Sequence, residues 1–116
     1  MRKLWLFLAL PLLFMGCKNN KQSFTFSSVS QKSIIRLHKK KGQGNIHALT
    51  ISGQGQINGS AVLTLILNKK PYRTVKLSGN AKFTWTSDWY ADSLKLQYTP
   101  TKVQGGKLVL NYVFKD

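Results

Sequence analysis

A short segment late in the chain, Asp88-Trp89-Tyr90-Ala91-Asp92, places two of the three acids beside two large aromatic side chains. Aromatic rings stack on sugars or bases while a neighbouring carboxylate orients hydroxyl groups, so Asp88, Trp89 and Tyr90 are candidates for a ligand-binding platform. The same residues also suit a turn in which the rings cap a hydrophobic core and the aspartates bond backbone amides. The second interpretation is favoured, because turns favour aspartate and the adjacent strand needs anchoring.

The other residue types that perform catalysis are sparse. His38 and His47 flank one loop and could meet across a hairpin, but a zinc site needs at least a third protein ligand. They are better explained as surface histidines on adjacent strands. The sequence also lacks a G-x-S-x-G elbow, a P-loop and a G-x-G-x-x-G motif. We therefore expect no enzyme, no bound metal and no cofactor.

Positive charge dominates the composition. The chain has 18 lysines and arginines against three acids, a formal net charge of +15, and it has no glutamate. Dense basic clusters of this kind bind anionic lipid surfaces or acidic glycans, although they also simply keep loop tips soluble. The candidates for binding an anionic surface are Lys39, Lys40, Lys41, Lys69, Lys70 and Arg73.

The first residues have the order of a secretory signal. Arg2 and Lys3 precede an apolar run over 4–15, which is too short for a permanent membrane-spanning helix. Gly16 and Cys17 close the run, and Cys17 is the only cysteine, so the chain has no intrachain disulfide.

The ending Leu13-Phe14-Met15-Gly16-Cys17 resembles the lipobox of bacterial lipoproteins. The resemblance covers only the signal, and Phe14 stands where the family usually has an aliphatic residue. It implies that Cys17 receives a diacylglyceryl group, that residues 1–16 are removed, and that two or three acyl chains then hold the protein on a membrane outside the cytoplasm. Lys18, in place of a retention aspartate, favours the outer membrane of a Gram-negative envelope. The mature chain, residues 17–116, has a formal net charge of +13.

Alternating apolar and polar residues recur throughout the mature chain and predict β-strands. No segment after the signal shows a helical stripe. The run over 61–67 is almost continuously apolar, which is typical of a central strand covered on both faces. The segments that alternate or run apolar lie near 23–26, 34–38, 49–51, 61–67, 74–77, 82–86, 94–98 and 108–114.

Turn residues separate these segments. Asn58-Gly59 predicts a two-residue hairpin, and Ser78-Gly79-Asn80 and Gly105-Gly106 predict further turns. We therefore expect a lipidated cysteine and polar tether over 17–22, followed by one all-β domain over 23–116. About eight antiparallel strands favour a β-sandwich, with a small closed β-barrel as the alternative. If successive strands alternate in direction, both lysine clusters lie at the tethered end.

These features lead to one functional expectation with two alternatives. The chain is expected to be a lipid-anchored, basic envelope module that binds anionic lipid, lipopolysaccharide phosphate or acidic glycan. The alternatives are an accessory subunit of an envelope protein complex, or an inhibitor or immunity-type lipoprotein with an acidic protein target. Nucleic acid suits the charge, but an exported protein does not meet it in the cell.

Overall fold

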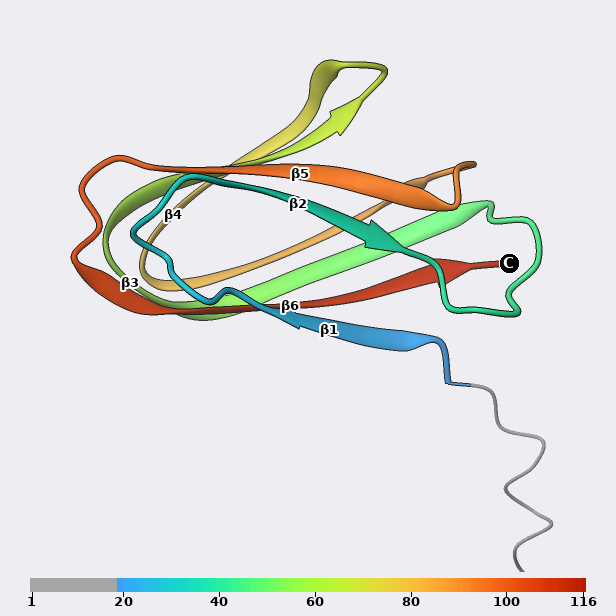
Figure 1. Ribbon diagram of the computed structural model, residues 1–116, viewed down its shortest axis with the longest axis horizontal. Coiled ribbons are helices and arrows are strands. Elements are labelled where there is room, and N and C mark those ends of the chain that lie inside the picture. The colour runs from blue at the N-terminus through green and yellow to red at the C-terminus, as the bar shows by residue number, and fades with distance from the viewer. Residues whose placement is uncertain (1–18) are drawn as a thin grey trace, which may run out of the picture.

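The computed structural model describes residues 19–116, which form six β-strands and no helix (Figure 1). The all-β expectation is therefore confirmed, and no helix among these residues can cross a membrane. The predicted signal, Cys17 and Lys18 lie outside the described residues. The strands are β1 (Lys21–Thr25), β2 (Ser33–His38), β3 (Ala48–Leu67), β4 (Lys70–Asp88), β5 (Ser93–Pro100) and β6 (Gly105–Lys115).

All six strands belong to one antiparallel sheet that curls on itself. The strand order is β1-β6-β3-β5-β2, and β4 pairs with β3 along its length. β3 changes partner halfway, because residues 48–58 pair with β6 and residues 61–66 pair with β5. One layer therefore contains β1, β6, the first half of β3 and the second half of β4. The other layer contains β2, β5, the second half of β3 and the first half of β4. These eight segments correspond to the eight predicted from alternation.

The predicted hairpin at Asn58-Gly59 is wrong. These residues interrupt the register between Ile57 and Ser60 within β3, and Gly79 lies opposite Ile57 in β4. Both glycines have positive φ, 136° at Gly59 and 59° at Gly79, so each marks the bend of a long strand. The β3–β4 ribbon thus passes from one layer to the other, which fits the sandwich-like arrangement (Figure 1).

The core lies between the two layers and follows the alternation. Leu63, Leu65 and Leu96 from one layer and Ile51 and Phe114 from the other are at most 1% exposed and belong to one cluster. The expectation that the run over 61–67 is covered on both faces is wrong. Its outward side chains are half-buried, because no further layer covers them.

The sheet does not close into the alternative barrel. β1 and β2 stand at opposite ends of the strand order and are not paired with each other, and β4 pairs only with β3. Unpaired strand edges invite association, which lysine and proline on an edge oppose. β4 carries Pro71, Lys76 and Lys82 along its free edge.

A buried hydrogen bond fixes β5 to the loop that follows β1. The Tyr98 hydroxyl is fully buried and donates to the Val29 carbonyl oxygen at 2.6 Å. Burial raises the pKa of Tyr98 above its usual value of 10.0. The neutral form is therefore favoured in the fold, and this contribution to stability is present below about pH 10 and lost as the pH rises through the raised pKa.

We expect Tyr98→Phe to lower the free energy of unfolding by about 1–2 kcal/mol at neutral pH, because it leaves the buried Val29 carbonyl without its donor. Urea denaturation followed by tryptophan fluorescence measures this change. Tyr90→Phe is the control, since Tyr90 is 76% exposed. Equal stability of the two variants would contradict the assignment.

Candidate site: two adjoining hollows beside the β3–β4 hairpin

The predicted platform divides into a buried and an exposed part. Trp89 is only 4% exposed, and its Nε1 donates to the Ser93 carbonyl oxygen at 3.0 Å. It therefore acts as the core cap that the favoured interpretation describes. Tyr90 projects into solvent and Asp88 is exposed, so these two side chains remain accessible.

The β3–β4 hairpin projects from the body of the molecule (Figure 1). Its tip, Asn68-Lys69, has positive φ at both residues, 52° and 66°, as a two-residue type I′ turn requires. Asparagine tolerates this conformation, whereas lysine costs about 1 kcal/mol relative to glycine. Lys69 therefore occupies a position where glycine would be less strained.

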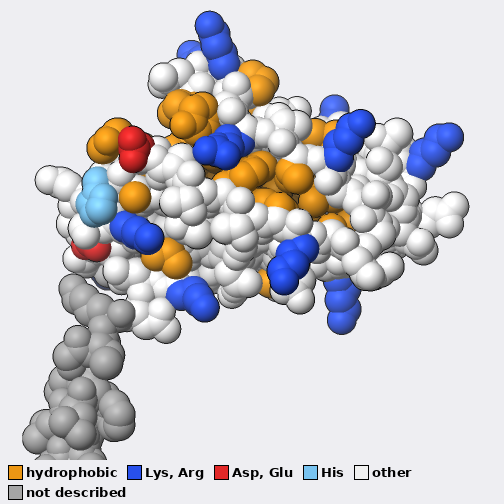
Figure 2. All heavy atoms as spheres, turned by 180° about the vertical axis from the view of Figure 1, so that it is seen from behind, with side chains coloured by type: hydrophobic (Ala, Val, Ile, Leu, Met, Phe, Trp, Pro, Cys, Tyr) orange, Lys and Arg blue, Asp and Glu red, His pale blue; other side chains and the backbone are white. Residues whose placement is uncertain are grey.

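An apolar hollow lies between the hairpin and the loop after β4. Its volume is about 440 Å³. Leu67, Tyr72 and Tyr90 are 37%, 46% and 76% exposed, and they are three of the four exposed large hydrophobic residues within 19–116. Seen from behind, apolar side chains gather at the base of the projecting hairpin, with Lys and Arg side chains spaced around them (Figure 2). The aromatic hollow is lined by Leu67, Tyr72, Asp88, Trp89, Tyr90 and Ala91.

A second hollow, of about 480 Å³, adjoins the first on the outer face of β2 and β5. Its ionisable lining consists of Arg36, His38, Lys69 and Lys95, with no carboxylate among the described residues that line it. Arg36 and Lys95 are direct cross-strand partners, and like charges in this position destabilise a sheet. The basic hollow is lined by Arg36, His38, Ile66, Leu67, Asn68, Lys69, Trp89, Ala91, Ser93, Leu94 and Lys95.

The two hollows share Leu67, Trp89 and Ala91, so an apolar surface passes directly into a cationic one. The sequence predicts Lys69, Trp89 and Tyr90 as site residues, but it does not predict Arg36 and Lys95. Their outward positions are readable from the alternation of β2 and β5. That they lie opposite each other depends on the register between two strands far apart in the chain.

The first predicted lysine cluster lies beside the tether, as the alternating-direction argument predicts. The Lys40 Nζ donates to the Asn19 carbonyl oxygen at 2.7 Å, two residues after Cys17. The Lys39 Nζ lies 3.3 Å from the Asp92 carboxylate and also donates to the Gly44 carbonyl oxygen at 3.1 Å. Lys41 is exposed, so it is the member of this cluster whose charge is most available to a ligand.

The second cluster does not form one surface with the first. Lys69 and Lys70 lie at the projecting hairpin, away from the tethered end in Figure 1. Arg73 donates from Nη2 to the Thr86 carbonyl oxygen at 3.4 Å and so joins the two halves of β4. Of the six predicted residues, Lys69 alone lines the basic hollow.

The histidines lie in different layers. His38 is opposite Ser93 on β5, whereas the backbone N–H of His47 donates to the Lys115 carbonyl oxygen at 2.8 Å beside β6. Within residues 19–116, no group of three or more His, Cys, Asp or Glu side chains comes close enough to hold a metal ion.

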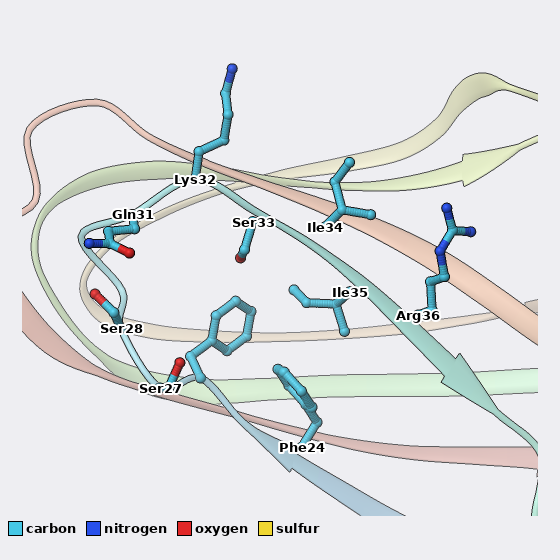
Figure 3. Close-up of a pocket in the computed structure, with 10 residues that line it drawn as sticks. Phe24, Ser27, Ser28, Gln31, Lys32, Ser33, Ile34, Ile35 and Arg36 are labelled. Carbon is cyan, nitrogen blue, oxygen red and sulfur yellow. The ribbon is translucent and has the colours of Figure 1, made fainter.

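A third, smaller hollow of about 250 Å³ lies between the free edges of β1 and β2. Figure 3 shows Phe24 and Ile35 directed toward this gap, with Ser27, Ser28 and Gln31 on the loop to their left. Lys32 points away from the gap. The hollow thus combines an apolar floor with two unpaired strand edges.

No protein-family profile matches this sequence, and no curated protein matches it. Among solved structures, the chain is similar to a subunit of Bacillus endospore appendages, described as disulfide-linked pili, at 8% identity and a TM-score of 0.47. That match covers 84% of this chain and 87% of the other. It is also similar to the tobacco streak virus coat protein at 11% identity and a TM-score of 0.41, with coverage of 86% and 89%. Neither likeness is close enough to carry an argument about function.

Proposed function

We propose that this chain is a lipid-anchored, strongly basic lipoprotein of a bacterial envelope, outer-membrane in location, whose β-domain binds anionic surfaces. The ligand class is anionic lipid, lipopolysaccharide phosphate or acidic glycan. The observation that carries the binding half of the proposal is the basic hollow, in which Arg36, Lys69 and Lys95 line one surface without a carboxylate. The anchoring half rests on the lipobox-like sequence that ends at Cys17.

The position of the tether supports this arrangement. Asn19 is held by Lys40, and the neighbouring Lys39 pairs with Asp92, which belongs to the loop between β4 and β5. That loop also supplies Trp89 and Ala91 to both hollows. A short series of contacts therefore links Asn19 to the loop that lines both hollows, which supports a site close to the predicted anchor.

The test uses the mature chain, residues 17–116, with Cys17→Ser to remove the lipid. We expect it to sediment with phosphatidylglycerol vesicles and to bind phosphatidylcholine vesicles at least tenfold more weakly. Each lysine or arginine near an anionic surface contributes about 1 kcal/mol, and the interaction falls off within about 8 Å at physiological salt. Binding should therefore weaken steadily as sodium chloride is raised. Equal, salt-independent binding to both vesicles would refute the proposal.

The aromatic hollow favours a second candidate, an accessory subunit of an envelope protein complex. Exposed Leu67, Tyr72 and Tyr90 together resemble the apolar centre of a protein interface. Crosslinking in intact envelopes, followed by purification of this chain, separates the two candidates. A stoichiometric protein partner that is lost in Tyr72→Ser/Tyr90→Ser supports the second candidate, and recovery with lipid alone supports the first. An inhibitor with an acidic target would appear in the same experiment as a hydrolase or toxin partner.

A further inference from the structure

We infer that the two adjoining hollows form one binding site for a single phosphate-bearing lipid. In this arrangement the phosphate lies in the basic hollow and the start of an acyl chain lies on the aromatic hollow. The inference rests on the proposed function and names the ligand of the same site.

Charge supplies the first argument. Arg36 and Lys95 face each other across β2 and β5, and neither side chain has a hydrogen bond or ion pair with any residue in the described part of the chain. Lys69 lines the same hollow from the hairpin tip. An anion placed among these three cations would relieve their mutual repulsion. A phosphate accepts bonds from several donors at once, and the planar guanidinium of Arg36 matches its geometry.

Backbone conformation supplies the second argument. Lys69 has a φ of 66°, where glycine is the residue that a type I′ turn prefers. A residue kept in an unfavourable conformation beside a hollow points to a role for its side chain. Replacing Lys69 with glycine should therefore raise the stability of the fold and lower the affinity for the lipid.

The apolar half distinguishes a lipid from a free anion. Leu67 and Trp89 line both hollows, so an apolar chain attached to the phosphate continues onto Tyr72 and Tyr90, and Asp88 is the one charged residue among the described residues that line the aromatic hollow. A free phosphate or an acidic sugar would leave that exposed apolar surface uncovered.

The test is an NMR titration of the mature, unlipidated chain (residues 17–116, Cys17→Ser) with short-chain lipids below their micelle concentration. We expect dihexanoyl phosphatidylglycerol to bind saturably and at least tenfold more tightly than dihexanoyl phosphatidylcholine or inorganic phosphate. The shifted amide signals should belong to residues 36–38, 66–72 and 88–95, which contain the lining of the two hollows. Equal affinity for phosphatidylcholine or for inorganic phosphate would overturn the assignment, as would shifts that lie elsewhere.

Substitutions inside and outside the basic hollow test which residues carry the binding. Arg36→Gln/Lys95→Gln should weaken phosphatidylglycerol binding at least tenfold. The control Lys102→Gln/Lys107→Gln removes the same charge from exposed positions that line neither hollow, and it should change binding less than twofold. Lys69→Gly should weaken binding several-fold while it raises the urea midpoint. Equal losses in the two double variants would mean that net charge alone is sensed, and the site would be refuted.

The vesicle assay separates this inference from the proposed function. Retained preference for anionic vesicles without saturable binding of the monomeric lipid refutes the single-lipid site only. Loss of both refutes the proposed function as well.

Discussion

Replacing Gly59 with alanine should lower the free energy of unfolding by about 3 kcal/mol or more, a large part of the stability of a domain of this size. Gly59 has a φ of 136°, which side chains with a Cβ rarely adopt. A Cβ at this position would also overlap the carbonyl oxygen of Lys102, a backbone atom that cannot move aside cheaply. Urea or thermal denaturation measures the loss.

Gly79→Ala is the matched control. Gly79 lies at the facing bend of β4 and also has a positive φ, 59°, but a Cβ there meets nothing within 4 Å. It should therefore lose only the cost of the left-handed conformation, about 1 kcal/mol. If Gly59→Ala costs no more than Gly79→Ala, the close approach between β3 and the loop that holds Lys102 is not present in solution.

The same bend shows what the sequence could and could not predict. Alternation identifies which side chains face inward, so Ile35 and Leu37 are buried while Ile34 and Arg36 are exposed. Asn58-Gly59 is a strong signal for positive φ, and that part is correct at Gly59. Whether such a signal ends a strand or bends it depends on the partner strands. β3 continues because β4 follows it through the bend, with Gly79 opposite Ile57.

The sequence predicts a connection over 68–71, between the segments 61–67 and 74–77, but it does not predict that this connection is a two-residue turn. Asn68-Lys69 lacks the glycine that would have marked a two-residue hairpin, although asparagine at the first position is a partial signal. Sequence patterns identify a turn by the residues that prefer its conformation. A turn with lysine at a position that prefers glycine is therefore not predicted as a tight turn. The departure from preference is itself informative, because it directs attention to the Lys69 side chain.

The candidate site was only partly predictable. Trp89 and Tyr90 stand out by residue type, yet the sequence cannot tell which ring is buried. The difference in exposure between the two rings follows from one contact. Trp89 Nε1 donates a hydrogen bond to the Ser93 carbonyl oxygen, which turns Trp89 inward. The Lys39–Asp92 pair also joins residues far apart in the chain, and it reduces the charge that this lysine cluster offers to a ligand. A run of lysines in a sequence therefore overestimates the positive charge that is available to a ligand.

Cys17→Ser should have the largest effect on location, because the lipobox-like motif assigns the whole anchor to this one sulfur. Each buried methylene contributes about 0.8 kcal/mol, so a single chain binds reversibly while two or three hold firmly. Without them, the variant has only its uncleaved apolar leader and the electrostatic attraction of the basic domain, which is screened by salt. We expect the variant in its native host to incorporate no alkyne fatty acid, to keep its leader by intact-mass analysis, and to be missing from the outer-membrane fraction.

Ser27→Ala is a suitable control, since it alters an exposed hydroxyl well past the tether and should leave labelling and fractionation unchanged. A wild-type chain that carries no label, or a Cys17→Ser chain that is processed and retained like the wild type, would remove the anchor from the proposal. The anionic binding of the domain would then have to be explained for a protein that reaches its surface by diffusion. In that case the affinity of the basic hollow alone would decide how much of the protein is bound, and the vesicle assay already measures that quantity.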